Sequence, residues 1–275
     1  MIRDIVVNLN VGAKASPVGD FAISVAAAFN AHLTGITFLY DPVVPVSSVG
    51  LLPAEVIVTQ QDYQVAVRAA RERFAAASES AGVTAEPVTL SASVVGVGDQ
   101  FGKIARRFDL AVVDQAESGT NAVQGVIVEA ALFDAGRPVI CVPFIQKEPL
   151  KLDRVMVCWD GSRAAARAIG DAMPLLQRAG RVEVVIVTKE RGKQDQIEGA
   201  DMGAHLARHG LNVEVKRIPI GDIDVAAMLL SHAADAGIDF IVMGGYGHSR
   251  LREFVLGGVT RSILQSMTAP VLMSH

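Results

Sequence analysis

Glycines near the C-terminus have the type and spacing that phosphate binding requires. Gly244 and Gly247 follow a short apolar run, Phe240–Met243, and Gly257 and Gly258 precede apolar residues at helical spacing. A backbone without a Cβ can approach phosphate closely, and a helix start adds unpaired N–H groups and the positive end of a dipole. The pattern G-x2-G-x9-G therefore predicts a polyphosphate loop between a buried strand and a helix. Any one of these glycines, taken alone, is explained as well by a tight turn.

Short apolar runs alternate with amphipathic segments along the whole chain. In the first half, strands are predicted at Ile2–Leu9, Leu33–Tyr40, Val88–Val95, Leu110–Val113 and Pro138–Val142, and helices at Phe21–Phe29, Gln60–Ser80, Gln100–Phe108 and Val123–Phe133. In the second half, strands are predicted at Val155–Cys158, Val182–Thr188, Val213–Ile218, Phe240–Met243 and Val271–Met273, and helices at Ala164–Gln177, Ile197–His209, Val225–Ala236 and Val259–Met267.

This alternation predicts parallel sheets joined by right-handed crossovers, with helices on both faces. The second half also repeats the first, because Asp109–Val113 resembles Asp239–Met243 and Arg137–Ile140 resembles Ala269–Leu272. We therefore expect an α/β chain of two doubly wound, Rossmann-like domains, each a five-stranded parallel sheet in the order 3-2-1-4-5. The expected domains are residues 1–147 and 148–275.

Asp160 follows the first strand of the second half, in the sequence Trp159-Asp160-Gly161-Ser162. By itself this motif is a turn with Ser162 as a helix N-cap. In doubly wound sheets, however, ligands lie beyond the carboxyl ends of the strands, where the strand order reverses. In the expected order this point falls between the first and fourth strands, so Asp160 and the glycines should face one crevice.

With these motifs the chain resembles a tandem universal stress protein over nearly its full length, with the glycine motif confined to the second half. The resemblance implies ATP as the ligand, possibly with Mg²⁺, and contact of Asp160 with the adenosine moiety. It also implies that the backbone at Val187 lines the adenine site. The implied phosphate residues are Met243, Gly244, Gly247, His248, Gly257, Gly258, Val259 and Thr260.

The sequence departs from the family pattern in both halves. The family normally has Ser or Thr after the last glycine, where this chain has Gly258, and Thr260 is the nearby hydroxyl that could compensate. The first half has Asn10 in place of the aspartate, and its Asp114–Gly119 segment has no G-x2-G. We interpret the first half as a degenerate domain that binds no nucleotide.

Three functions remain open at this stage. The resemblance favours an ATP-binding regulator of the stress response with little or no catalysis. A slow ATPase is the second, in which His248, Arg250 and Arg252 steady the γ-phosphate, although these residues also fit a solvated loop and helix. The third is a scaffold or a sensor of another small molecule, which Gly258 and the apolar 43–58 segment favour. Adenine nucleotide and an unidentified protein are the expected partners.

Composition narrows the class of protein further. The 275 residues are 51% hydrophobic and 20% charged, with a net charge of −4, which gives no general attraction for nucleic acid or anionic membranes. No segment has the length and apolarity to span a bilayer, so we expect a cytoplasmic protein. The last strands of the halves, at Val139 and Val271, have edges that could meet as an internal pseudo-dimer, and a homodimer is also possible.

Remaining candidate motifs have structural explanations. Cys141 and Cys158 lie in apolar strands and should be buried free thiols. His205 and His209 share one helix face, yet the residues between them lack the glutamate of a zinc-protease helix, so we expect them to be solvated. Gly96–Gly102 only partly matches a dinucleotide fingerprint and is interpreted as a turn. No Walker motif or nucleophile elbow occurs.

Overall fold

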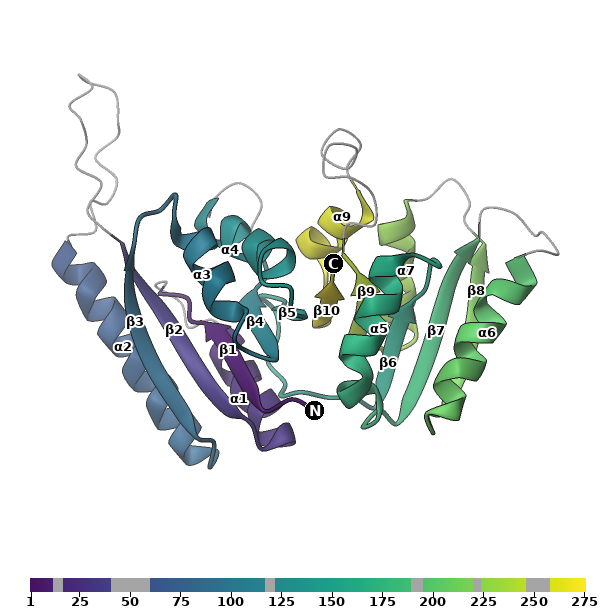
Figure 1. Ribbon diagram of the computed structural model, residues 1–275, viewed down its shortest axis with the longest axis horizontal. Coiled ribbons are helices and arrows are strands. Elements are labelled where there is room, and N and C mark those ends of the chain that lie inside the picture. The colour runs from purple at the N-terminus through teal and green to yellow at the C-terminus, as the bar shows by residue number, and fades with distance from the viewer. Residues whose placement is uncertain (12–16, 41–59, 117–121, 189–194, 220–223, 246–257) are drawn as a thin grey trace, which may run out of the picture.

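The computed structural model describes the chain except for residues 12–16, 41–59, 117–121, 189–194, 220–223 and 246–257. The described strands form one ten-stranded sheet in the order β3-β2-β1-β4-β5-β10-β9-β6-β7-β8. Figure 1 shows two five-stranded units side by side, with β5 and β10 meeting at the centre and α2 and α6 at opposite ends.

The elements follow the expected alternation in both units. The first half contains β1 (Asp4–Asn8), α1 (Val18–Phe29), β2 (His32–Tyr40), α2 (Gln60–Ser80), β3 (Ala85–Ala92), α3 (Val97–Ala105), β4 (Leu110–Asp114), α4 (Ala122–Phe133) and β5 (Val139–Val142). The second half contains β6 (Arg154–Cys158), α5 (Arg163–Leu176), β7 (Arg181–Thr188), α6 (Asp195–Arg208), β8 (Val213–Pro219), α7 (Val225–Asp235), β9 (Phe240–Gly244), α9 (Val259–Ser266) and β10 (Val271–Ser274).

Each half has the predicted strand order. Within each half the strands pair in parallel in the order 3-2-1-4-5, which confirms the doubly wound fold. The two units join because β10 pairs antiparallel with β5, placing Val271 opposite Cys141 and Met273 opposite Val139. The last strands of the two halves therefore meet, which is the arrangement that the sequence allowed for their edges.

Helices cover both faces of the sheet, and each face carries a hydrophobic core that runs through both halves. On one face, Phe21 of α1 and Leu175 of α5 are buried in the same cluster. On the other face, Phe101 of α3, Ile127 of α4 and Ile263 of α9 are buried together. The central strands are apolar on both sides because both sides are covered.

The segment that connects the two halves, between β5 and β6, contacts α1 of the first half. The backbone N–H of Leu150 donates to Ser24 Oγ at 2.8 Å, and the guanidinium of Arg178 lies 4.5 Å from the centre of the Phe29 ring. These contacts tie α1 of the first half to the connection and to the end of α5. No helix in the described ranges is both long enough and apolar enough to cross a membrane.

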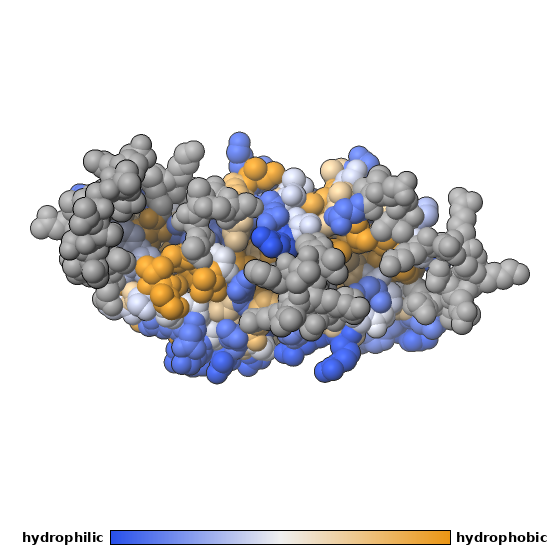
Figure 2. Space-filling model, turned by 90° about the horizontal axis from the view of Figure 1, so that it is seen from above, coloured by the Kyte–Doolittle hydropathy of each residue, from blue (hydrophilic) through white to orange (hydrophobic). Residues whose placement is uncertain are grey.

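The third strand and third helix each begin three residues earlier than predicted, at Ala85 and Val97. Because β3 is an edge strand with partly exposed residues, its apolar pattern is weak, and Pro87 is tolerated where a missing N–H costs no ladder bond. Val94 and Val95 lie instead in the β3–α3 connection, 39% and 92% exposed. Figure 2 shows exposed apolar surface on this half of the molecule.

The segment Gly96–Gly102, interpreted from sequence as a turn, begins a helix. Gly96 is the N-cap of α3, and Gly98 and Gly102 lie within the helix. A Cβ on Gly98 would lie 2.4 Å from Val126 Cγ1 and 2.9 Å from the Val126 carbonyl oxygen of α4. This correction has a packing explanation, because small residues let α3 and α4 approach closely.

Candidate functional site

The candidate site lies where the strand order of the second half reverses, between β6 and β9. These strands are adjacent and parallel, with Val155 opposite Phe240 and Val157 opposite Val242. Parallel neighbours end at the same edge of the sheet, so the loop after β6 and the loop after β9 begin side by side. Asp160 lies in the first of these loops, and Gly244 ends the second strand. The sequence-predicted pair is therefore brought to one edge.

Asp160 is exposed and organises the turn before α5. Its Oδ1 accepts a hydrogen bond from the Ser162 N–H at 2.9 Å, and Gly161 has a φ of +74°, which favours glycine. Ser162 is the N-cap, because its Oγ accepts from the Ala165 N–H at 3.1 Å. The turn interpretation of this motif is correct. Because only Oδ1 is engaged in that turn, Oδ2 is the atom that a ligand donor could reach.

Gly244 brings the end of β9 against the first turn of α5. A Cβ on Gly244 would lie 2.5 Å from the Ala165 backbone nitrogen and 2.7 Å from the Ala164 carbonyl carbon. Real Cβ atoms do not approach backbone this closely, so glycine is required here for packing. As a result, the N-terminal end of α5 lies at the same edge as the start of the glycine segment.

Helix α9 begins at Val259 on the far side of the glycine segment, with Gly258 as its N-cap. Gly258 has extended backbone angles, φ −62° and ψ 153°, and has no side chain with which to cap the first-turn N–H groups. Thr260 is 4% exposed, so its side chain is buried beneath the first turn. This helix start has the donors that an anion requires, and its N-cap has no hydroxyl.

At two further residues of the predicted site, the side chain packs against the core. Val187 is the next-to-last residue of β7 and is half-buried against the core, and Met243 is 5% exposed within β9. Their side chains pack inward, which agrees with a role limited to main-chain atoms. Gly247, His248 and Gly257 lie outside the described residues.

Cys158, at the end of β6, is a potential nucleophile close to Asp160. Burial, and secondarily the neighbouring Asp160 carboxylate, raises the pKa of this thiol to about 12. Burial also raises the pKa of Cys141 to about 12. Both thiols are free, and Cys141 is buried as predicted, whereas Cys158 is only half-buried. Each is protonated at neutral pH, so neither provides a thiolate.

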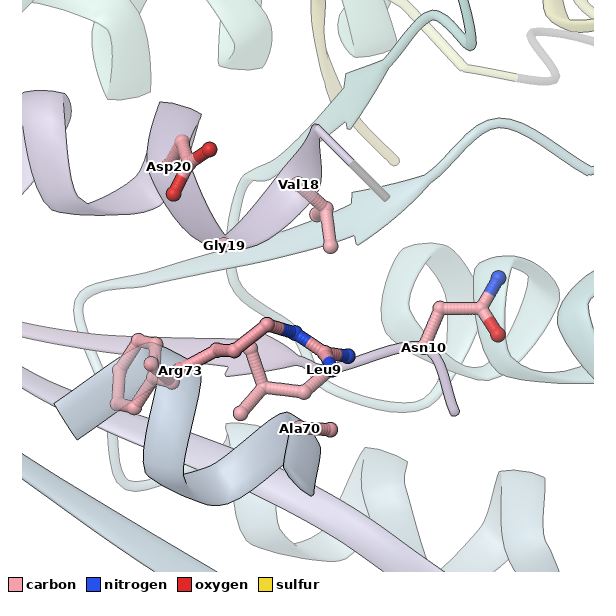
Figure 3. A pocket seen from close by; sticks show the side chains of 8 residues that line it. Leu9, Asn10, Val18, Gly19, Asp20, Ala70 and Arg73 are labelled. Atoms are coloured by element: carbon pink, nitrogen blue, oxygen red, sulfur yellow. The ribbon is translucent and has the colours of Figure 1, made fainter. Parts of the chain in front are cut away.

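At the corresponding edge of the first half, the described residues include a buried pair of polar side chains. Asn8 is buried, and its Nδ2 donates to Gln124 Oε1 at 3.4 Å. Beside Asn10, the described residues enclose a cavity of about 100 Å³, shown in Figure 3, lined by Leu9, Asn10, Val18, Gly19, Asp20, Ala70, Arg73 and Phe74. Ligand pockets usually measure roughly 300–1,000 Å³. This cavity is therefore too small for a nucleotide.

Phe74 explains why so little space remains there. Its ring is 4% exposed, and a Cβ on Gly35 of β2 would lie 2.5 Å from Phe74 Cε1 and 2.9 Å from Leu9 Cδ1. In Figure 3, Asn10 follows Leu9 at the end of β1 with its amide directed away from Arg73. The first half thus has an amide and packed apolar groups at the end of β1, where the second half has an exposed carboxylate.

Metal binding by protein groups alone has no basis in the described residues, which contain no group of three His, Cys, Asp or Glu side chains placed to hold an ion. His205 and His209 are exposed as expected, with ring centres 4.8 Å apart. Mg²⁺ in nucleotide sites is usually held by phosphate oxygens, water and one or two carboxylates.

The strand order places the chain in the class of doubly wound α/β proteins, in which ligands commonly lie where the strand order reverses. Residues 151–275 match the model of the universal stress protein family. A universal stress protein from Synechocystis is 26% identical over 171 residues, a match covering 60% of this chain and 57% of that protein. One from Methanocaldococcus jannaschii is 42% identical over 41 residues, or 15% of this chain and 25% of its own.

Solved structures extend the likeness of fold to the whole chain. A universal stress protein from Archaeoglobus fulgidus superposes with a TM-score of 0.74 at 17% identity, covering 98% of this chain and 95% of its own. A protein of unknown function from Pseudomonas aeruginosa superposes with a TM-score of 0.64 at 13% identity, covering 99% and 92%. The likeness in fold to these two structures therefore extends over both halves of this chain.

Proposed function

We propose that the second half binds ATP at the edge formed by the ends of β6 and β9. The observation that carries this proposal is the meeting of Asp160 and Gly244 at the reversal point, with the N-terminal end of α5 against Gly244. In this arrangement Asp160 Oδ2 accepts a hydrogen bond from the nucleoside, and the backbone at Val187 lines the site of the base. The phosphates lie along the glycine segment toward Gly258 and the start of α9, where the dipole and N–H groups favour negative charge.

We propose further that the chain comprises two universal stress protein domains, 1–147 and 148–275, and that only the second is a nucleotide site. The repeated strand order supports two domains. The roughly 100 Å³ cavity beside Asn10 and the packing of Phe74 against Gly35 support a first domain without nucleotide. Occupancy of the second domain then acts as a signal read by a protein partner.

The described side chains at this edge favour binding over turnover. Asp160 is engaged with Ser162, and the Cys158 thiol is protonated at neutral pH. A general base must reach the attacking water or hydroxyl within hydrogen-bond distance. We therefore propose hydrolysis far slower than the ~1–10³ per second typical of enzymes.

Native mass spectrometry of freshly purified protein, followed by calorimetric titration of nucleotide-free protein with ATP, tests the proposal. One ATP per chain is expected. Two equivalent sites per chain would contradict the assignment of the first half. No binding at millimolar ATP, with or without Mg²⁺, would overturn the nucleotide function itself.

A second candidate function, sensing of another small molecule, is favoured by a groove in the first half. It measures about 670 Å³ and lies where α3 leaves part of β2 and β3 uncovered. Ile36, Val88 and Leu90 line it together with Lys103 and Arg107 of α3. A purified chain that carries a non-nucleotide adduct, lost in Leu90→Arg but retained in Asp160→Ala, would establish this function instead.

A further inference from the structure

The first half contacts the start of the glycine segment through α4. A Cβ on Gly245 would lie 2.9 Å from both Leu132 Cδ1 and Leu132 Cδ2, so the glycine backbone rests directly on this leucine. Gly245 is also buried, and its N–H donates to the Ser274 carbonyl oxygen at 2.8 Å. The point at which the chain leaves β9 is thus fixed between β10 of its own half and α4 of the other.

His275 adds a second connection to the same point. Its Nδ1 lies 3.0 Å from the Gly245 carbonyl oxygen, and because a carbonyl can only accept, the ring carries its proton on Nδ1 in this contact. The ring packs edge-on against Phe133 of α4, with centroids 5.0 Å apart and planes at 74°. Phe133 therefore packs against the His275 ring, which in turn donates a hydrogen bond to the Gly245 carbonyl oxygen.

Gln115, which follows β4 of the first half, holds the C-terminal end of helix α9. Gln115 is 5% exposed, and its Nε2 donates to the Gln265 carbonyl oxygen near the end of α9 at 3.0 Å. Its Oε1 accepts from the Phe144 N–H at 3.1 Å, which fixes the orientation of the amide. Helix α9, which begins just after the glycine segment, is thereby tied at its other end to the first half.

We infer that the first half positions the nucleotide site of the second half, acting through Leu132 and Phe133 on Gly245 and through Gln115 on α9. The inference rests on the proposed ATP function. None of the three residues needs to contact the ligand, because holding the backbone at Gly245 and at α9 in place avoids an ordering cost that would otherwise weaken binding. Coupling of this kind is reciprocal, so ATP stabilises the contact between the halves as much as the contact strengthens ATP binding.

The test uses the full chain with Leu132→Val, Gln115→Ala and Phe101→Leu. Phe101 packs against Phe38, with ring centroids 6.5 Å apart, so its substitution removes a contact that is internal to the first half. Each protein is titrated with ATP and with adenosine well below its melting temperature. Amide hydrogen exchange of residues 244–266 is measured on the same proteins without nucleotide.

In Gln115→Ala we expect ATP affinity to fall about threefold to tenfold, the range for loss of one neutral hydrogen bond. Leu132→Val should weaken ATP in the same direction. Both should leave adenosine affinity nearly unchanged, because adenosine does not use the phosphate loop, and both should accelerate exchange in residues 244–266. Phe101→Leu should lower the melting temperature without either effect.

Three results would overturn the inference. ATP affinity and exchange equal to the parent in both contact variants would show that the contacts only join the halves. Equal losses for ATP and adenosine, or equal losses in Phe101→Leu, would show general destabilisation. If the parent binds no ATP, the proposed function fails on its own, and the exchange measurement alone then decides whether the first half positions this segment.

Discussion

Gly244 and Ala165 lie so close together that a Cβ on the glycine would stand 2.5 Å from the alanine nitrogen. The end of β9 therefore contacts the first turn of α5. As a result, backbone N–H groups that could bind an anion, at the strand end and at the helix start, lie at one edge of the sheet. Neither residue contributes a side chain to this arrangement. Substitutions at this edge therefore test directly how closely the two backbones approach.

Gly244→Ala should lower the free energy of unfolding by about 1–3 kcal/mol, the usual cost of overpacking, because the added methyl meets backbone atoms. Gly170→Ala is the matched control, since this exposed glycine within α5 has open space around an added Cβ. It should instead stabilise by about 0.4–1 kcal/mol. Urea denaturation measures both. Equal effects of the two substitutions would show that the close approach does not exist in solution.

Asp160→Ala should weaken binding of ATP and of adenosine by similar factors, because the carboxylate is proposed to contact the nucleoside. Gly247→Ala should weaken ATP more than adenosine, because the glycine is predicted from sequence to lie against phosphate. Titration calorimetry with both ligands separates the two ends of the site. If both variants bind ATP as the parent does and melt normally, the glycine segment is only a turn.

Gly258→Ser should tighten ATP binding several-fold, consistent with about 0.5–1.5 kcal/mol for one added neutral hydrogen bond. The N-cap of α9 has no side chain at present, and Thr260 in the first turn is buried. Gly258→Ala serves as the control, because it adds a Cβ without a hydroxyl. Equal affinities of the serine and alanine variants would exclude a direct role for the hydroxyl.

Both cysteines should resist alkylation in the folded protein at pH 8 and react fully after unfolding. Burial raises the pKa of each thiol from its ordinary 9.0 to about 12, so the reactive thiolate is scarce in the native state. Unfolded thiols lose their protons near pH 9, whereas folded ones keep them. The free energy of unfolding should therefore decrease as pH rises above about 9. Rapid modification of Cys158 at pH 8 without unfolding would contradict its desolvation.

The strand order, and the common edge at which the loops of Asp160 and Gly244 begin, were predictable because both follow from local patterns and a general rule of doubly wound sheets. Short apolar runs such as Phe240–Met243 mark buried strands, and the reversal point then selects the loops of Asp160 and Gly244. The edge strand Ala85–Ala92 was misplaced because partial exposure weakens its apolar pattern.

Contacts between the halves could not be predicted in the same way. Gln115 and Gln265 are 150 positions apart, and nothing in either local sequence indicates the hydrogen bond between them. Leu132 reads as an ordinary core residue of a helix, although it supports Gly245 of the other half. Such pairs depend on how β5 and β10 join, and the sequence predicted only that these edges could meet.

Joining β5 to β10 also determines how this molecule can associate with copies of itself. Once these two edges are paired, the outer strands of the sheet order are β3 and β8. Pro87 interrupts the donors of β3, and β8 has exposed Glu214, Lys216 and Arg217, features that discourage edge-to-edge aggregation. Neither of the described outer strands therefore favours extension of the sheet by another copy of the chain.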